Sequence, residues 1–405
     1  MDFKKILKGG IALMMAATMF GCSGGSSTSE TTTTTTDETT ETAGAIKIGN
    51  SGPLTGGAAV YGIAVKNAIE LAVEEINAMG GLQFEYNPQD DAHDAEKAVT
   101  AYGVLTDWGM QISLGNVTST PMAAVAPMYS EDHIFALTPS ASSLASIYSD
   151  TQNMSGSYGT VFQMCFTDPN QGTASAQYIK AHSDLGTKIA IIYKNDDNYS
   201  SGVRDKFVAT AATEGLEVVY EGTFDDSNAT DFTVQLKQAQ SSGADLVFLP
   251  IYYDPASLIL TQANAMNYTP TFFGVDGMDG ILSLEGFDTS LAEGVYLLTP
   301  FSADATDDKT VNFVTKYQEK YGETPNQFAA DAYDCVYAVY QACTNGNVTA
   351  DMSASEIADI LVDQFTSMTF DGITGTDVTW AATGEVSKSP KAVVITDGVY
   401  VGVED

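Results

Sequence analysis

Residues 188–193 read KIAIIY, and residues 246–249 read LVFL. Both runs are short and almost continuously apolar, which is typical of strands that helices cover on both faces of a parallel sheet. Helical patterns lie between and after them, at about 201–214, 231–240 and 255–266. Strands that alternate with helices in this way predict a doubly wound α/β fold.

The first half of the chain repeats the same unit. Strands are expected at 46–49, 82–86, 112–114 and 134–138, and helices at 60–78 and 94–106, with a short one from 121. Asp94 is the expected N-cap of the second helix. About 360 residues are too many for one such sheet, so we expect two lobes. An eightfold α/β barrel is the alternative, but the antiparallel pattern of 378–380 and 392–401 argues against it.

The composition excludes several classes of protein. The chain has 405 residues, 44% of them hydrophobic, which is enough for sizeable cores and excludes wholesale disorder. It carries 17 Lys and Arg against 52 Asp and Glu, a net charge of −35. Nucleic-acid phosphates and anionic lipid headgroups both require a basic surface, so we expect neither as a partner.

The N-terminus has the pattern of an export signal. Lys4, Lys5 and Lys8 precede an apolar run at 11–20, which is too short to span a bilayer. The following residues, 19–22, read MFGC and resemble a bacterial lipobox, in which the cysteine receives a diacylglycerol. We therefore expect a lipoprotein signal peptide at 1–21, lipid on Cys22 and a Ser/Thr-rich flexible linker at 22–44. An ordinary secretory signal with an incidental cysteine is the alternative.

The other cysteines do not form a disulfide framework. Cys335 and Cys343 are eight residues apart in a helical pattern, about 12 Å along the axis, which is too far for a disulfide. Cys165 has no evident partner. We expect all three to be free buried thiols.

The residues that follow the predicted strands carry the chemistry, because ligands of open parallel sheets bind beyond the carboxyl ends of the strands. Ser119 and Ser142 stand near helix starts, where hydroxyls and N–H groups suit a carboxylate; the alternative is simple N-capping. Asp276 lies in a Gly-flanked turn that suits an ammonium, or it is an Asx-turn residue. Three tyrosines can line an apolar pocket or merely pack at an interface: Tyr61, Tyr199 and Tyr252.

Signals of catalysis are missing from the sequence. No predicted strand is followed by a G-x-S-x-G elbow, a phosphate-binding G-x-x-x-x-G-K-[ST] loop or a G-x-G-x-x-G turn. The histidines, His93, His133 and His182, lack the spacing of metal ligands. We therefore expect no enzyme, no metal and no cofactor.

Ordered sequence landmarks then point to a known family. They include IKIGNSGPLTGGAAVYG from residue 46, LGNVTSTP from 114, LTPSASS from 137, IAIIYKNDDNYSSG from 189 and FFGVDG from 272. In this order and spacing, residues 45–403 resemble the leucine/isoleucine/valine-binding proteins. These are the type I periplasmic solute-binding components of ABC transporters for amino acids and amides.

The resemblance implies roles for particular residues. Ser119 would bind the ligand α-carboxylate, and Ser142 would touch both ends of the amino acid. The main-chain carbonyl of Ser140 and the carboxylate of Asp276 would accept from the α-ammonium. The pocket-lining positions would be Tyr61, Val117, Tyr199, Tyr252 and Tyr333. Where some relatives have a disulfide in the first lobe, His93 and Thr118 stand in this chain.

The resemblance also implies an architecture and a function. Crossings between the lobes are expected near 166–167, 299–300 and 367–371, which places 45–166 and 300–367 in lobe one and 167–299 and 368–405 in lobe two. The chain would be a monomeric, lipid-anchored extracytoplasmic protein that passes a small amino acid, branched-chain or related, to a permease and its ATPase. The alternatives are an amide, urea, purine or aromatic acid as ligand, a signalling receptor module, or a secreted hydrolase.

Overall fold

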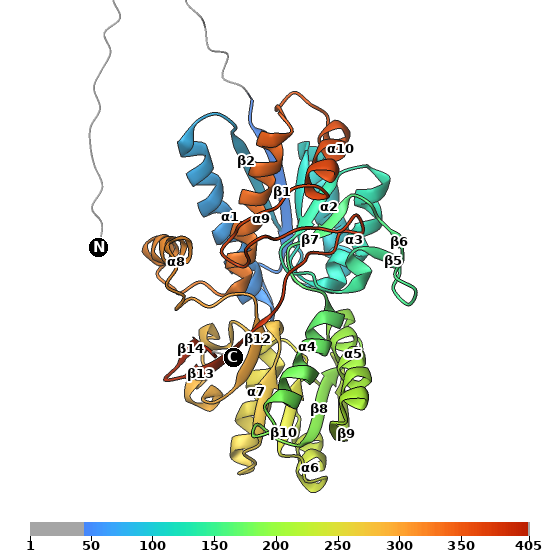
Figure 1. Cartoon of the computed structure of the whole chain (residues 1–405), viewed down its shortest axis with the longest axis vertical. Coiled ribbons are helices and arrows are strands. Elements are labelled where there is room, and N and C mark those ends of the chain that lie inside the picture. Colours follow the sequence, from blue (N-terminus) through green and yellow to red (C-terminus); the bar gives the residue numbers. More distant parts are fainter. Residues whose placement is uncertain (1–43, 404–405) are drawn as a thin grey trace, which may run out of the picture. The chain divides into compact units, whose positions relative to one another are not determined.

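The computed structural model describes residues 44–403 (Figure 1). The predicted signal peptide, Cys22 and nearly all of the linker lie outside the described residues. Within the described part of the chain, no helix is long and apolar enough to cross a membrane. The strands form two main sheets, and both consist largely of parallel strands.

The first sheet has five parallel strands in the order β2-β1-β3-β4-β7. Its strands are β1 (Ile46–Gly52), β2 (Phe84–Asp90), β3 (Ile112–Asn116), β4 (Phe135–Thr138) and β7 (Val161–Gln163). Its helices are α1 (Ala59–Met79), α2 (Ala95–Trp108), α3 (Ser119–Glu131), α9 (Gln327–Asn345) and α10 (Ala354–Phe365). Asp94 caps α2 as predicted, because its carboxylate accepts from the Lys97 N–H.

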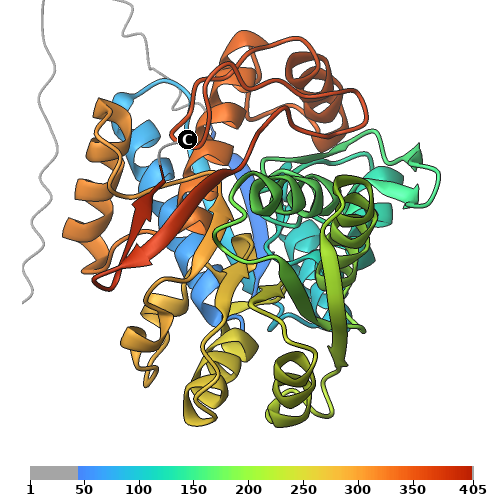
Figure 2. The same ribbon diagram turned by 60° about the horizontal axis from the view of Figure 1, so that its bottom comes forward.

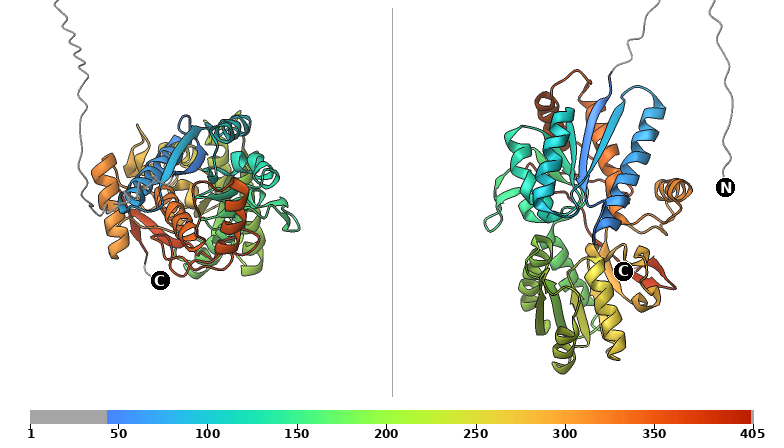
Figure 3. Two further views of the ribbon diagram at one scale, coloured as in Figure 1. Left: turned by 90° about the horizontal axis from the view of Figure 1, so that it is seen from above. Right: turned by 180° about the vertical axis from the view of Figure 1, so that it is seen from behind.

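Helices cover both faces of this sheet, as Figure 3 shows. Side chains alternate across a strand. Phe135 and Leu137 of β4 therefore pack into the core that includes α1 and α9, whereas Ala136 packs with α2 and α3.

The second sheet has seven strands in the order β14-β13-β12-β11-β10-β8-β9. Its strands are β8 (Lys188–Lys194), β9 (Glu217–Phe224), β10 (Leu246–Leu249), β11 (Thr271–Gly274), β12 (Tyr296–Thr299), β13 (Lys391–Thr396) and β14 (Val399–Gly402). Its helices are α4 (Asp168–Ala181), α5 (Asn198–Glu214), α6 (Thr233–Ser241) and α7 (Tyr253–Ala265). Figure 2 shows this sheet with its helices.

The run KIAIIY is strand β8 in the interior of this sheet. Ile189 and Ile191 pack against α4 and α5, whereas Ala190 and Ile192 share a core with α6 and α7. Both faces of the strand are buried, which is why its sequence is continuously apolar. The predicted fold class, two doubly wound parallel-sheet lobes, is thereby confirmed, and the barrel alternative is wrong.

Smaller elements complete the fold. They are α8 (Asp308–Tyr321), the hairpin β5 (Tyr148–Asp150) and β6 (Ser155–Ser157), and the 3-10 turns η1 (Leu144–Ser146), η2 (Asp276–Met278), η3 (Ile281–Ser283) and η4 (Thr289–Ala292). The described cysteines, Cys165, Cys335 and Cys343, are free and buried as predicted.

The antiparallel pairing predicted for the C-terminal part is present, but only its second segment forms strands. Residues 378–380 form no strand; Val378 and Trp380 make isolated bridges to Phe370 and Val386. The tail is a hairpin, β13 and β14, antiparallel to each other and to β12.

Residues 370–386 pack with the first lobe, where the Trp380 ring lies 4.7 Å from Phe365 and its indole N–H donates to the Gln163 carbonyl. Because aromatic packing and a buried hydrogen bond hold this segment, we place the third crossing at 387–390 instead of 367–371. The first two crossings stay predictions.

Candidate functional site

The candidate residues gather where strands of both sheets end. Tyr61 lies on α1 after β1, Ser119 opens α3 after β3, and Ser140 and Ser142 follow β4. From the other sheet, Tyr199 lies in the first turn of α5, Tyr252 precedes α7 and Asp276 follows β11. Several of these segments are in direct contact between the two sheets, and we call the region where they meet the cleft.

Contacts across the cleft join the lobes. The Tyr61 hydroxyl donates to the Gly277 carbonyl and accepts from the Tyr253 N–H at 3.1 Å. The Val60 N–H donates to the Tyr253 hydroxyl at 3.2 Å. At another point, the Thr120 hydroxyl donates to the Asp197 carboxylate at 3.4 Å. The structure therefore has the lobes drawn together over the cleft.

Asp276 is the centre of the second-lobe wall. Its carboxylate accepts from the Tyr199 hydroxyl at 2.7 Å and from the Gln171 amide at 2.8 Å. Burial raises the pKa of this carboxyl to about 7. Within residues 44–403, no Lys, Arg or His forms an ion pair with it. An ionised Asp276 therefore lacks a cationic partner, which is costly in a buried site.

Gly277 must be a glycine for this wall to form. The Tyr199 hydroxyl accepts from the Gly277 N–H at 2.9 Å, so the phenol lies directly over the main chain. A Cβ at this position would collide with the Tyr199 hydroxyl and the Ile251 carbonyl. The glycine thus brings Tyr199 and Asp276 together.

The first-lobe wall supplies hydroxyl and N–H groups. The Ser119 hydroxyl accepts from the Ser143 N–H at 3.2 Å, and the Ser140 hydroxyl donates to the Val117 carbonyl at 2.6 Å. The Ser142 hydroxyl is buried beside the Asp168 carboxyl but makes no well-formed hydrogen bond. Burial raises the pKa of Asp168 well above its ordinary value.

Aromatic rings occupy the middle of the cleft. Tyr252 stacks on Tyr199 with centroids 4.9 Å apart and planes 4° apart. Tyr61 and His93 approach the Tyr252 ring edge-on, at 5.4 and 5.5 Å. Phe328, at the start of α9, lies 4.2 Å from Tyr61. The cleft thus presents ring faces as well as charges and hydrogen-bonding groups.

Two further predicted residues make their side-chain contacts inside the first lobe, and any ligand contact from either stays a prediction. Val117 packs into the first-lobe core over Gly52, where a Cβ would collide with its side chain. Tyr333 lies on α9, and its hydroxyl donates to the Glu75 carboxylate on α1 at 2.5 Å. The structure does not bring Tyr333 together with the cleft residues.

Sequence reasoning missed Gln171, Gln327 and Asp168. The Gln327 amide donates to the Asp276 carbonyl at 2.8 Å, and its N–H donates to Asp279 at the same distance. These side chains reach the cleft from helix starts, not from strand ends. For Asp168 and Gln171, the available signal was their position directly after the crossing predicted near 166–167. No local pattern indicated Gln327.

The site holds no evident metal ligands. No group of three or more His, Cys, Asp or Glu residues suited to a metal ion occurs among residues 44–403. His93 instead forms a hydrogen bond with the Thr118 hydroxyl at 2.9 Å.

Comparisons with known proteins agree with this architecture. The chain is 25% identical over 301 residues to the leucine-, isoleucine-, valine-, threonine- and alanine-binding protein of Pseudomonas aeruginosa, covering 73% of this chain and 77% of that one. It is 25% identical over 364 residues to Leu/Ile/Val-binding protein homolog 3 of Brucella melitensis, covering 89% and 94%.

Among solved structures, the branched-chain amino acid transporter substrate binding protein LivJ of Streptococcus pneumoniae, in complex with isoleucine, superposes with a TM-score of 0.78. Its sequence identity is 26%, and the match covers 89% of this chain and 99% of that one. The sequence model of one protein family, described as periplasmic binding protein, matches residues 45–398 of this chain. The chain therefore belongs to the periplasmic binding proteins and has their type I fold.

Proposed function

We propose that this protein is the solute-binding lipoprotein of an ABC importer and captures a small amino acid, branched-chain or a related aliphatic one. The observation that carries the proposal is Asp276, a buried carboxylate with hydrogen-bond donors and no cationic partner in the described chain. The α-ammonium of an amino acid would supply the missing charge. The ligands named for the relatives support the aliphatic side chain.

The opposite end of the ligand would meet the first lobe. The α-carboxylate would take the hydroxyl and N–H groups of Ser119 and Ser142, next to the start of α3. The ligand side chain would lie among the rings of Tyr61, Tyr199 and Tyr252. Neither lobe carries both sets of groups, so binding and closure would be linked.

The remaining parts of the proposal concern location and partners. The protein would be held outside the cytoplasmic membrane by lipid on Cys22, act as a monomer, and deliver its ligand to a permease driven by an ATPase. It would catalyse nothing. The lobes, with the third crossing moved to 387–390, would turn about the three connecting segments.

A thermal-shift screen against the twenty amino acids and common amides tests the proposal. A ligand that binds only the folded state, at about 100 times its Kd, stabilises it by about 2.7 kcal/mol. We expect one or a few aliphatic amino acids to raise the midpoint in the wild type and not in Asp276→Asn.

A ligand that stabilises both proteins equally would lack the ammonium contact. This outcome would favour the second candidate, a purine, urea, amide or aromatic acid in the same cleft. A flat response to every compound would contradict the amino-acid proposal.

A further inference from the structure

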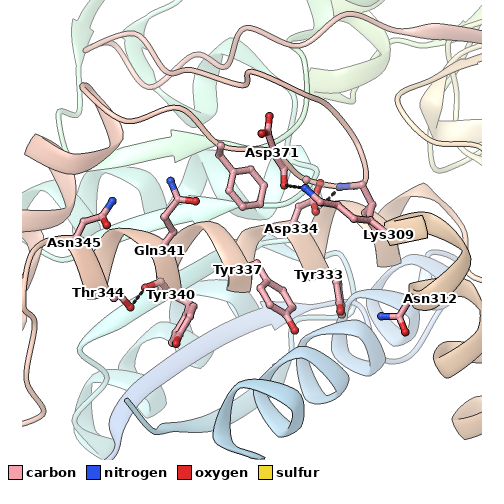
Figure 4. A pocket seen from close by; sticks show the side chains of 13 residues that line it. Lys309, Asn312, Tyr333, Asp334, Tyr337, Tyr340, Gln341, Thr344, Asn345 and Asp371 are labelled. Atoms are coloured by element: carbon pink, nitrogen blue, oxygen red, sulfur yellow. Dashed lines mark hydrogen bonds between the residues drawn. The ribbon is translucent and has the colours of Figure 1, made fainter. Parts of the chain in front are cut away.

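A cavity lies along α9, and none of the residues that meet in the cleft lines it. Its volume is about 480 Å³, which is within the usual range of small-molecule sites. α9 forms its floor, the segment 370–373 forms one wall, and residues of α8 close one end (Figure 4). Along α9 it extends from Tyr333 to Asn345, about 18 Å at 1.5 Å per residue.

Aromatic rings line much of this cavity. Figure 4 shows Tyr333, Tyr337 and Tyr340 leaving α9 on one side, and Gln341 and Asn345 on the other. Phe370 adds a ring from the opposite wall. Ring faces of this kind favour a flat aromatic guest, which they hold by offset or edge-on contact.

The acids around the cavity already have partners. The Asp334 carboxylate accepts from the N–H groups of Ile373 and Thr374, both at 2.9 Å. The Asp371 carboxylate accepts from the Asp377 N–H at 2.8 Å. Behind the tyrosines, the Glu75 carboxylate accepts from Tyr337 and Lys316 at 2.8 and 2.6 Å. These carboxylates are therefore poor candidates for contacts with a guest.

Lys309 has donor capacity left. Its ammonium donates to the Asp371 carbonyl at 2.7 Å, and in the described chain it forms no ion pair. In Figure 4 it lies at one end of the cavity, beside Asn312. An ammonium has three donors, so two of them can bind an anionic group.

We propose that this cavity binds a small aromatic carboxylate, with the ring over the tyrosines of α9 and the carboxylate on the Lys309 ammonium. The ring would supply most of the affinity through buried apolar area. The charge-assisted bond to Lys309 would fix the orientation. The site is separate from the amino-acid cleft and does not depend on the proposed function.

Ligand-observed NMR and calorimetric titration with 4-hydroxybenzoate and 4-hydroxycinnamate test this site. We expect binding of about 1 mM or tighter, which corresponds to about −4 kcal/mol. The affinity should fall about fivefold or more in Lys309→Met, since a charge-assisted bond is lost. Lys320→Met is the matched control, because Lys320 lies on the same helix but pairs with Glu74 on α1.

Two further measurements separate the cavity from the cleft and the charge from the ring. Asp276→Asn should leave the binding of both acids unchanged. The uncharged probe 4-hydroxybenzamide should bind wild type about as weakly as 4-hydroxybenzoate binds Lys309→Met. Three outcomes would overturn the proposal: no binding to wild type, equal loss in Lys320→Met and Lys309→Met, or loss of binding in Asp276→Asn.

Discussion

The hydroxyl of Tyr61, on α1, donates a hydrogen bond to the main-chain carbonyl of Gly277, which lies beyond β11 of the other sheet. The same oxygen accepts from the Tyr253 N–H at 3.1 Å, and the Tyr61 ring is fully buried. One phenol thus satisfies two main-chain groups across the cleft. Opening the lobes breaks both bonds, so Tyr61 favours the closed arrangement.

Tyr61→Phe should therefore weaken ligand binding without unfolding the protein. The closed state would leave a buried carbonyl and a buried N–H without this partner, at about 1–3 kcal/mol, which is about 5- to 150-fold in Kd. Calorimetric titration with the amino acid found in the screen measures the Kd of Tyr61→Phe and of wild type.

Tyr129→Phe is the control for Tyr61→Phe. Tyr129 is equally buried, but its hydroxyl accepts from Ser113 at 2.8 Å inside the first lobe. This change should lower stability and leave Kd unaltered. If both variants weakened binding to the same extent, the inter-lobe role of Tyr61 would be wrong.

The pH dependence of binding should follow Asp276. Its carboxyl titrates near pH 4 in an unfolded chain, whereas burial raises its pKa to about 7 in the ligand-free fold. Between these values the folded protein holds a proton that the unfolded chain has lost, so ligand-free stability should fall as pH rises from about 4 to about 7. An ammonium ligand needs the ionised form, so its affinity should fall below about pH 7, by at most about tenfold per pH unit.

Calorimetric titrations of the protein with its ligand, at about pH 5.5, 6.5 and 7.5, measure how Kd depends on pH. His93→Gln tests another titratable group of the cleft, whose pKa burial lowers. The variant should keep the profile of wild type. A Kd that does not change over this range, or a profile that disappears in His93→Gln, would show that Asp276 does not control binding.

The sequence predicted the strand-end part of the site better than the rest. Tyr199 and Asp276 follow β8 and β11, so the general rule for parallel sheets was enough to bring them together. Gln327 reaches Asp276 from the start of α9, far along the chain, and no local pattern indicates that contact. The two strands KIAIIY and LVFL, by contrast, are specified by burial on both faces.

The sequence pattern did not predict the position of the third crossing, because side-chain contacts hold the segment after α10 against the first lobe. Asp334 accepts from the N–H groups of Ile373 and Thr374, and Trp380 packs against Phe365. These are single long-range contacts in an irregular segment. The resemblance placed the crossing directly after the residues of α10 and so did not include the further residues that stay with the first lobe.

Cys22→Ser tests the predicted anchor. If Cys22 carries lipid, the variant should be released from the membrane fraction, since two acyl chains anchor a protein stably. Membrane fractionation with immunoblotting measures the share of protein in the membrane fraction. Ser23→Ala is a neighbouring control that should stay with the membrane. Wild type found mainly in the soluble fraction would favour the ordinary secretory signal.

The buried ion pair of Lys388 and Asp331 should be important for stability. Their side chains are 2% and 3% exposed, and the ammonium lies 2.8 Å from the carboxylate and 2.6 Å from the Thr374 hydroxyl. Lys388→Met leaves Asp331 buried without its counter-ion, which costs about 3–5 kcal/mol. Replacing both charges, in Lys388→Met with Asp331→Leu, should recover most of that loss, because no unpaired charge remains.

Urea denaturation of wild type, the single variant and the double variant measures these differences. Lys316→Met is the matched control, because Lys316 forms an ion pair of similar length with Glu75 but its side chain is 42% exposed. It should cost about 1 kcal/mol or less. If Lys388→Met cost no more than Lys316→Met, burial would not decide the strength of the pair, and the segment that carries Lys388 would be held to the first lobe by its packing and main-chain bonds instead.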